Sequence, residues 1–483
     1  MSLGNAQYYI LTTEGDIQGQ FASQYHAEQD GRTMPDVIPS EVDGGYYILR
    51  PWRKSPSLIG AYVGYEITKV DGTFNALWTK SFFPEKKKEG IFLQKAETGF
   101  DRLVVIQSNM RSWIAQTMKN TEMVCFDSEN GDELYRVSLY DETYTSLPNQ
   151  INFDEQGNIT LGGEYYAGTK IKVTGSEGVF AMKLDPAGDE LGQNRSSWKE
   201  GIQRQMKRGN ISLSGKNKVI FHDLISTEDG GFQLIGETFS KKQTMGSNSM
   251  AGLGMRMLAR AAGMEDEDAQ KLNEAIDLKN FIIALASGRF IGDPLDLYGK
   301  IQTPTILTIQ DMLVFDYDDN LELTNVNKVQ KAYTKVYAYP PYTTIGGLRL
   351  AKIMNNFGFF DYSFTEKSFE SGTQTMVYNS MMSKRPHIGV VDIEKGSEAE
   401  PKQFVIKNLK KYGGFDAEAQ AAEVESEAEA SEEQESKPAK MRYSNAGVAK
   451  ANNGKVVIYY IEKDQKAETG TLKLFHETFN EDI

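Results

Sequence analysis

The segment Asp154-Glu155-Gln156-Gly157-Asn158-Ile159-Thr160-Leu161-Gly162-Gly163-Glu164 decides the fold. Its first glycine supplies the positive φ of a tight turn, and the neighbouring Asp and Asn tolerate that conformation and form local hydrogen bonds. The β-branched and apolar residues behind the turn prefer a pleated strand. The segment therefore predicts the turn and the second strand of a β-hairpin.

Two patterns of this kind alternate along the chain, and each predicts one hairpin. In the first, an acidic or amide residue and one or two glycines precede alternating apolar residues, as at Asp43–Leu49, Glu97–Ile106, Asp154–Glu164, Glu228–Glu237 and Asn452–Tyr459. In the second, an apolar strand ends in aspartate and a short turn leads to another strand, as at Ile67–Gly72, Met123–Leu134, Phe180–Leu191, Leu313–Leu321 and, less regularly, Ile388–Asp392.

The spacing of these hairpins predicts the architecture. The separation is 56 residues from Asp71 to Asp127 and 58 residues from Asp127 to Asp185. The glycine series repeats at 54 and then 58 residues, at Gly45, Gly99 and Gly157. A unit of this length with two hairpins is one four-stranded propeller blade. We therefore expect an all-β chain that forms a single β-propeller over residues 1–483. We expect about six four-stranded blades, with seven blades or a pair of β-sandwiches as the alternatives.

Rotation of equivalent blades about one axis makes a further prediction. Equivalent turns should hold Asp71, Asp127, Asp185 and Asp316, and a second equivalent set should hold Gly45, Gly99, Gly157, Gly231 and Gly454. The N-terminal segment Tyr8–Thr13 is expected to pair with Thr471–Phe475, because such closure hides the strand edges of the ring.

Asp154-Glu155-Gln156-Gly157 and Asp185-Pro186-Ala187-Gly188 are both Asp-x-x-Gly turns. On these turns the chain resembles exported bacterial β-propeller proteins of uncharacterised function. The resemblance covers most of residues 36–480 apart from two insertions. It implies a fold and almost no activity, because the motif carries no catalytic residue to transfer.

Two insertions interrupt the period. Residues 241–304 are expected to be partly helical, with short helices near 251–262 and 266–286, because Ala, Met, Leu, Glu and Lys dominate there. Residues 411–442 are acidic and almost without large apolar side chains, so we expect a disordered surface segment. The functional interpretation of the first insertion is a cap on one propeller face. That of the second is a docking segment for a basic partner.

Charge and cysteine content limit the classes of partner and site that the chain can have. The net charge of -14 and the pI of about 5.0 disfavour nucleic acid and anionic lipid as partners. The single cysteine, Cys125, lies in an apolar run and is expected to be a small buried hydrophobe. No segment approaches the length of a transmembrane helix. Residues 1–7 resemble the end of a cleaved signal behind an expression leader, which favours export to the periplasm or cell surface, with the cytoplasm as the alternative.

No catalytic residue can be chosen from the sequence. The four histidines, His26, His222, His387 and His476, are scattered and form no helical metal-binding pair, so we expect none to be catalytic. The Asp-rich segment at Asp316 lacks the glycine and glutamate of an EF-hand calcium loop. We expect no metal and no cofactor.

Two aromatic groups are the binding candidates, because aromatic rings beside basic or hydroxyl groups stack on sugars and anchor peptides. They are Trp52 with Arg53, expected in a loop, and Tyr337 with Tyr339 and Tyr342. Packing between blades is the competing interpretation. The sequence thus favours a non-catalytic binding or scaffold protein that uses a propeller face for a protein, peptide or glycan. The alternative is an enzyme acting on a glycan or small molecule in the propeller channel, which buried ionisable groups converging there would favour.

Overall fold

The structure is a computed structural model. It describes residues 7–11, 17–22, 36–40, 42–53, 62–84, 89–110, 117–172, 175–208, 218–243, 305–338, 347–356, 358–367, 374–382, 385–393, 402–405, 444–450, 455–464 and 469–478. In this part of the chain, no helix is long and apolar enough to cross a membrane.

Six antiparallel sheets, here called blades 1 to 6, follow one another along the chain. Blade 1 holds β3 (Asp36–Pro39), β4 (Tyr46–Arg53), β5 (Tyr62–Val70) and β6 (Ala76–Phe82). Blade 2 holds β7 (Ile91–Gly99), β8 (Arg102–Asn109), β9 (Thr117–Asp127) and β10 (Glu133–Ser138), with β13 (Lys170–Lys172) paired to β9. Blade 3 holds β11 (Tyr144–Phe153), β12 (Ile159–Ala167), β14 (Gly178–Leu184) and β15 (Glu190–Ser197).

The second half of the chain repeats this plan. Blade 4 holds β16 (Lys218–Ser226), β17 (Phe232–Gln243), β18 (Thr305–Tyr317) and β19 (Leu323–Val329), with β20 (Thr334–Ala338) paired to β18. Blade 5 holds β21 (Tyr362–Lys367), β22 (Gln374–Met382), β23 (Arg385–Asp392) and β24 (Lys402–Val405). Blade 6 holds β25 (Ser444–Lys450), β26 (Lys455–Asp464) and β27 (Thr469–Thr478). The helices among the described residues are η1 (Trp198–Ile202), α1 (Gln203–Arg208) and α5 (Gly347–Asn356).

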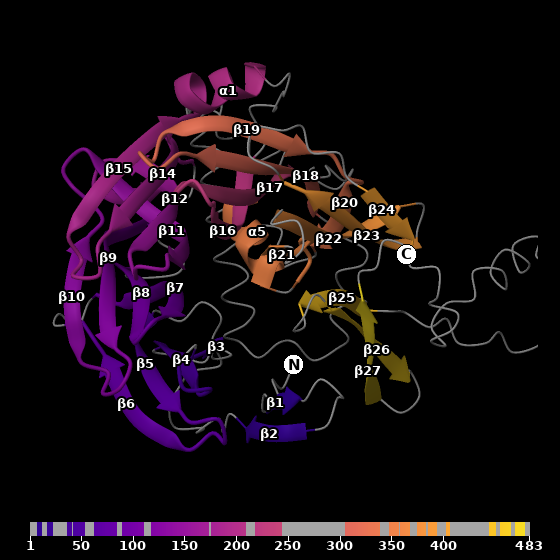
Figure 1. Ribbon diagram of the computed structural model, residues 1–483, viewed down its shortest axis with the longest axis horizontal. Helices are drawn as coiled ribbons and strands as arrows, with labels where there is room; N and C mark the ends of the chain where they lie inside the picture. The colour runs from indigo at the N-terminus through magenta and orange to yellow at the C-terminus, as the bar shows by residue number, and fades with distance from the viewer. Residues whose placement is uncertain are drawn as a thin grey trace, which may run out of the picture.

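The blades form a ring with the first strand of each blade innermost (Figure 1). The innermost strands β7, β11 and β16 contact one another in sequence, and β21 continues the series to β25. The protein is therefore an all-β propeller, and the described part of the chain forms six blades. A separate two-stranded sheet of β1 (Gln7–Leu11) and β2 (Ile17–Ala22) lies between blade 6 and blade 1 in Figure 1. The expected closure was wrong, because β1 pairs with β2 and not with β27.

The core lies between blades, which decides against two sandwiches. On β8, Leu103 and Val105 pack with blade 1, whereas Val104 and Ile106 pack with blade 3. Successive side chains of a strand point to opposite faces, so one strand serves two interfaces. Cys125 is buried in the blade 2–blade 3 interface, as the sequence predicted. Each interior sheet therefore needs a neighbour on both sides.

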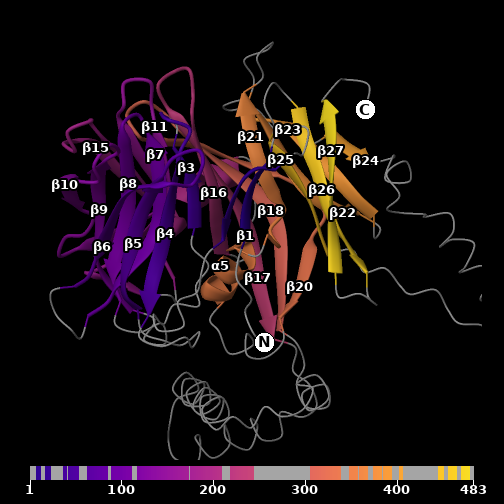
Figure 2. The ribbon, with the colours of Figure 1, turned by 90° about the horizontal axis from the view of Figure 1, so that it is seen from below.

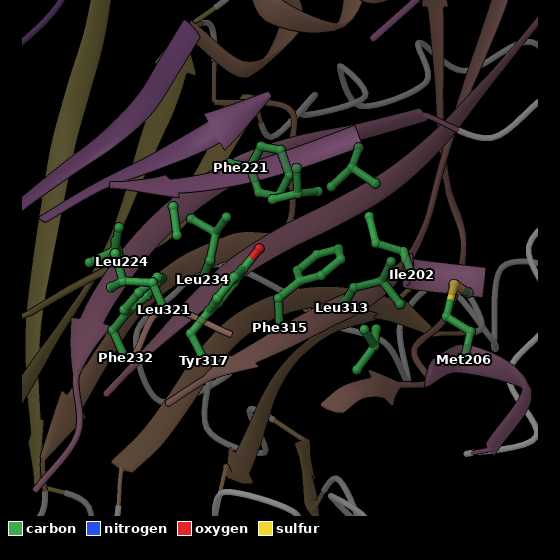
Figure 3. Packing of buried hydrophobic residues seen from close by; sticks show 14 residues of the cluster. Ile202, Met206, Phe221, Leu224, Phe232, Leu234, Leu313, Phe315, Tyr317 and Leu321 are labelled. Atoms are coloured by element: carbon green, nitrogen blue, oxygen red, sulfur yellow. The ribbon is translucent and has the colours of Figure 1, made fainter. Parts of the chain in front are cut away.

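The interface of blades 3 and 4 shows how this core is closed at the rim (Figure 3). Phe221, Leu234 and Phe315 fill its centre, and Ile202 and Met206 from η1 and α1 cover one end. Burying a Leu or Phe side chain contributes roughly 1.5–3 kcal/mol. The two helices were not expected from the sequence, and they extend the apolar interface beyond the sheets.

The aspartate turns connect the third and fourth strands of blades 1 to 4. The backbone N–H of Asp71 donates to Asn75 O, and that of Asp185 donates to Asp189 O. The equivalent residue in blade 4 is Asp318, whose N–H donates to Glu322 O, and not Asp316. Asp316 is the wrong member of the predicted set because it precedes the turn by two residues and is fully buried within β18.

The glycine turns connect the first and second strands. Gly157 adopts φ +79, as predicted, but the positive φ lies at Gly44 and Gly230 and not at Gly45 and Gly231. Gly45 is needed for another reason, because a Cβ there would lie 2.3 Å from the carbonyl oxygen of Val70. In blade 2 the residue with positive φ is Phe100. The turns therefore join equivalent strands in these blades, but the residue with positive φ differs from one turn to the next. Gly454 lies outside the described residues.

The two ends of the ring differ, as Figure 2 shows. The glycine and aspartate turns share one end, which we call the turn end, because strands of an antiparallel sheet alternate in direction. The last strands of blades 3, 4 and 5, which are β15, β19 and β24, run towards the opposite end, called the connection end. Helix α5 lies there, where Leu348 and Ala351 pack with Phe239.

The predicted insertions fall mostly outside the described residues. The strand β17 continues to Gln243 and pairs with β18, so residues 241–243 belong to blade 4 and not to the first insertion. Residues 244–304, with both expected helices, and residues 411–442 lie outside the described part of the chain.

Candidate functional site

Four ionisable side chains meet between blades 4 and 5, and we call them the Glu237 cluster. Glu237 lies on β17, His222 on β16, Lys331 between β19 and β20, and Asp361 immediately before β21. Their side chains are 0, 6, 0 and 8% exposed, respectively. Buried charges are costly unless they are paired, so this group needs an explanation that a surface group would not.

Glu237 is the centre of the cluster. Its Oε1 lies 2.8 Å from Lys331 Nζ, and its Oε2 lies 3.2 Å from His222 Nε2 without the geometry of a hydrogen bond. The backbone N–H groups of Asp361 and Tyr362 donate to the same Oε2 at 3.1 and 3.4 Å. Although burial acts to raise the pKa of Glu237, Lys331 and His222 outweigh it and lower that pKa.

Asp361 shares Lys331 with Glu237. Its Oδ2 forms a short ion pair with Lys331 Nζ and accepts a hydrogen bond from Thr334 Oγ1 at 2.8 Å. Burial, reinforced by the Glu237 charge, raises the pKa of Asp361 to about 7. The pKa of Lys331 is raised, because the two carboxylates outweigh the effect of burial on its ammonium. The environment thus separates two neighbouring carboxyl groups into an ionised one and one that holds a proton near neutral pH.

His222 and Tyr362 connect this cluster to a third carboxylate. Their rings stack with centroids 5.0 Å apart, and the Tyr362 hydroxyl donates to Asp223 Oδ2. Burial and the Asp223 charge raise the pKa of Tyr362, so the phenol stays neutral. His222 is the one histidine of four whose side chain the structure describes. The prediction that no histidine is catalytic stays a prediction.

An exposed tyrosine stands beside the cluster. The Tyr333 hydroxyl donates to Asp311 Oδ2 at 3.2 Å, and Lys328 Nζ lies 3.1 Å from the same oxygen. Tyr333 is 50% exposed, so its ring is held in place by a hydrogen bond while half of it stays accessible. Such a ring can contact a ligand without ordering a mobile side chain first.

Of the predicted binding residues, Trp52 and Tyr337 lie on different blades. Trp52 lies within β4, paired with Gly64, and its ring packs edge-on against Phe83, so the loop expected there was wrong. The strand continues because Arg53 also pairs with β5. Tyr337 lies on β20 of blade 4.

Some predicted side chains cannot be placed. The side chains of Arg53 and Tyr337, and residues Tyr339 and Tyr342 as a whole, lie outside the described part.

Sequence reasoning missed the Glu237 cluster, although a signal was present. Gly163-Glu164 and Gly236-Glu237 end two of the glycine repeats with the same charged residue. A glutamate at the sixth position of the second strand, which has a neighbouring strand on each side, is expected to be buried, and a buried glutamate requires a partner. The partners Lys331 and Asp361 are 94 and 124 residues away from Glu237 in the sequence, so only the fold identifies them.

The comparison with protein families gives one match. The model described as "Family of unknown function (DUF6770)" matches residues 13–278, which is more than half of the 483 residues. The chain belongs to this family. Within DUF6770, the matched region holds blades 1 to 3, β16 and β17, and therefore Glu237 and His222, whereas Lys331 and Asp361 follow it. No curated protein matches the chain.

Solved structures also match at low identity. The Trypanosoma rangeli sialidase in complex with sialic acid is 8% identical with a TM-score of 0.37, and the match covers 98% of this DUF6770 chain and 57% of the sialidase. The endo-arabinase from Bacteroides thetaiotaomicron is 10% identical with a TM-score of 0.27, covering 79% of this chain and 95% of that one. The WD40 domain of SCAP from fission yeast is 10% identical with a TM-score of 0.24, covering 94% and 88%. Such distant likenesses carry no inference about activity.

Proposed function

We propose that this protein is a non-catalytic binding or scaffold protein that uses the connection end of the propeller to bind a protein, peptide or glycan. The observation that carries the proposal is the anchoring of the connection between blades 4 and 5. Lys331 near its start and Asp361 at its end form an ion pair with each other inside the fold. Fixing both ends of the connection in this way lowers the entropy cost of binding by described residues beside them, such as Tyr333.

The composition of this connection supports a binding role. It carries the exposed and hydrogen-bonded Tyr333, and along the sequence it contains Tyr337, Tyr339 and Tyr342. Aromatic side chains provide a large contact area with little loss of rotamer freedom. Export to the periplasm or cell surface, where such ligands are abundant, remains part of the proposal.

Labelled protein applied to arrays of oligosaccharides and of peptides tests the proposal. Wild type should bind a restricted set of probes. The double variant Tyr333→Ala/Tyr337→Ala should lose at least about tenfold in affinity, because truncation of a tyrosine that anchors an interface typically costs more than about 1 kcal/mol. Leu191→Ala, which changes an exposed side chain on the outer strand β15, is the matched control and should bind normally. Equal binding by the double variant and wild type would contradict the proposal.

One observation favours the alternative, an enzyme acting on a glycan or small molecule. Glu237 and Asp361 are neighbouring carboxyl groups with opposite pKa shifts, an arrangement used for general acid–base catalysis. Mass spectrometry of each bound oligosaccharide or peptide after incubation separates the two functions. Unchanged ligand masses favour the binding protein, and shortened products that disappear with Glu237→Gln favour the enzyme.

A further inference from the structure

We propose that Glu237, Lys331 and Asp361 form a proton-operated latch, which holds β20 and α5 on blade 4 while it carries one extra proton and loosens them when that proton is lost. This inference concerns the conformation of the connection end and does not depend on the proposed function.

The two ends of the connection meet at one buried carboxylate. Lys331 Nζ lies 2.8 Å from Glu237 Oε1, and the backbone N–H of Asp361 donates to Glu237 Oε2 at 3.1 Å. Thr334, the first residue of β20, donates its hydroxyl to Asp361. The described parts of the connection, β20 and α5, are thus fixed at both ends by contacts that involve charge.

The charges in the latch do not balance without a proton. Two carboxylates share one ammonium, and all three side chains are nearly inaccessible. An uncompensated charge is costly to bury, so one proton should reside on Asp361. The raised pKa of Asp361, about 7, agrees with a proton held there near neutral pH.

Apart from His222, whose Nε2 lies 3.2 Å from Glu237 Oε2 without a hydrogen bond, the surrounding groups do not supply the missing positive charge. On β16, Asp223 accepts a hydrogen bond from Tyr362 of β21. On β18 and β19, Asp311 and Lys328 pair with each other. Among the described residues, Lys331 is the one basic side chain of the lysine or arginine type that lies within ion-pair distance of Glu237 and Asp361.

Loss of the proton should loosen the connection locally without unfolding the ring. Helix α5 also packs through Leu348, Ala351 and Met354 against Phe239. These apolar contacts do not depend on pH, so they limit the motion to partial opening. Local opening of this kind is measured by hydrogen exchange.

Hydrogen exchange of peptides from Gly347–Asn356 between pH 5.5 and pH 8.5, corrected for the intrinsic exchange rate, tests the latch. Protection in wild type should fall as pH rises towards about 7, because opening releases the proton that the closed form holds, and should be constant above that pH. The fall should approach about tenfold per pH unit, because one proton is linked to the opening. Asp361→Asn imitates the protonated acid, so its protection should stay high at pH 8.5. Asp316→Asn changes another buried carboxylate of blade 4 and should keep the wild-type pH dependence.

A second variant keeps the test decisive if Asp361→Asn does not fold. Thr334→Val removes a hydroxyl that stabilises the ionised Asp361, so the upper end of the pH dependence should move to higher pH. Protection of α5 that does not change with pH in wild type overturns the latch. A pH dependence that survives in Asp361→Asn, or an upper end that Thr334→Val leaves unchanged, overturns it as well.

Discussion

Glu164 in blade 3 and Glu237 in blade 4 occupy the same place in the repeat but not the same environment. Each is the sixth residue of the second strand, follows a glycine and is buried. Glu164 accepts hydrogen bonds from the hydroxyls of Ser176 and Tyr166, at 2.7 and 3.1 Å. Glu237 is held instead by the Lys331 ammonium and by backbone N–H groups of blade 5.

The difference shows what a repeat does and does not specify. The period fixes the depth and direction of each glutamate side chain, because the strands share a register. Its partners come from connections and from the next blade, which vary in length and sequence. Glu164 acts on the charge of Lys218, whose pKa is lowered, chiefly by burial, with Glu164 acting in the opposite direction. Glu164 is therefore held by hydrogen bonds from uncharged hydroxyl groups, whereas Glu237 belongs to an ionic cluster.

Replacing the lysine beside each glutamate should give the largest difference in stability between the two sites. Lys331→Met leaves two carboxyl groups buried without their cation and should lower the free energy of unfolding by about 3–5 kcal/mol at pH 7. Lys218→Met should cost less than about 1 kcal/mol, because the lowered pKa shows that its charge is poorly accommodated. Urea unfolding followed by circular dichroism measures both. Equal losses would show that the two glutamates depend on their lysines alike.

Replacement of the glutamates themselves should give a smaller contrast. Glu237→Gln should cost about 2 kcal/mol, because it weakens a charge-assisted contact to Lys331. Glu164→Gln should cost about 1 kcal/mol, because the amide oxygen can still accept one hydroxyl hydrogen bond. The same unfolding measurement compares them at pH 7, and a greater loss for Glu164→Gln would reverse our assignment of the ionic site.

The aspartate turns, which belong to the repeat, should contribute equally to stability in blades 3 and 4. Asp185 Oδ1 accepts hydrogen bonds from the backbone N–H groups of Ala187 and Asp189, and Asp318 Oδ1 accepts the equivalent pair. Asp185→Ala and Asp318→Ala should therefore each lower the free energy of unfolding by about 1 kcal/mol. A difference of more than about 1 kcal/mol between the two would mean that these turns are not equivalent.

The smallest expected signal is the titration of the two lysines. Burial favours the neutral amine of Lys331, but Glu237 and Asp361 outweigh it, so its pKa lies above the ordinary 10.5, whereas that of Lys218 lies below 10.5. Lys331 thus contributes stability that is lost as pH rises through its folded-state pKa. Stability rises instead as pH increases between the folded pKa of Lys218 and 10.5. Nitrogen-15 NMR of the lysine Nζ groups measures the order, with Lys218→Arg and Lys331→Arg as assignment variants.

The sequence predicted the propeller because the turns that repeat along it are formed by residues close together in the chain. Asp185 with Gly188 and Asp154 with Gly157 form turns from neighbouring residues alone, so their signal survives without knowledge of the partner blade. The error of two residues at Asp316 has the same origin. Leu313-Val314-Phe315-Asp316 resembles the end of a strand, but β18 continues to Tyr317 because Asp316 is buried and held by Gln233. Tertiary contacts overruled the local pattern there.

By itself the sequence determined the class of fold, the alternation of two hairpins in each blade and the burial of Cys125, because these follow from turn chemistry and a period of two. The tertiary structure decided which charges meet. Glu237, Lys331 and Asp361 come from three separate segments, and their pKa values depend on burial and on distances of a few ångströms. No local pattern encodes such distances, since a charge acquires its energy from whatever the fold places beside it.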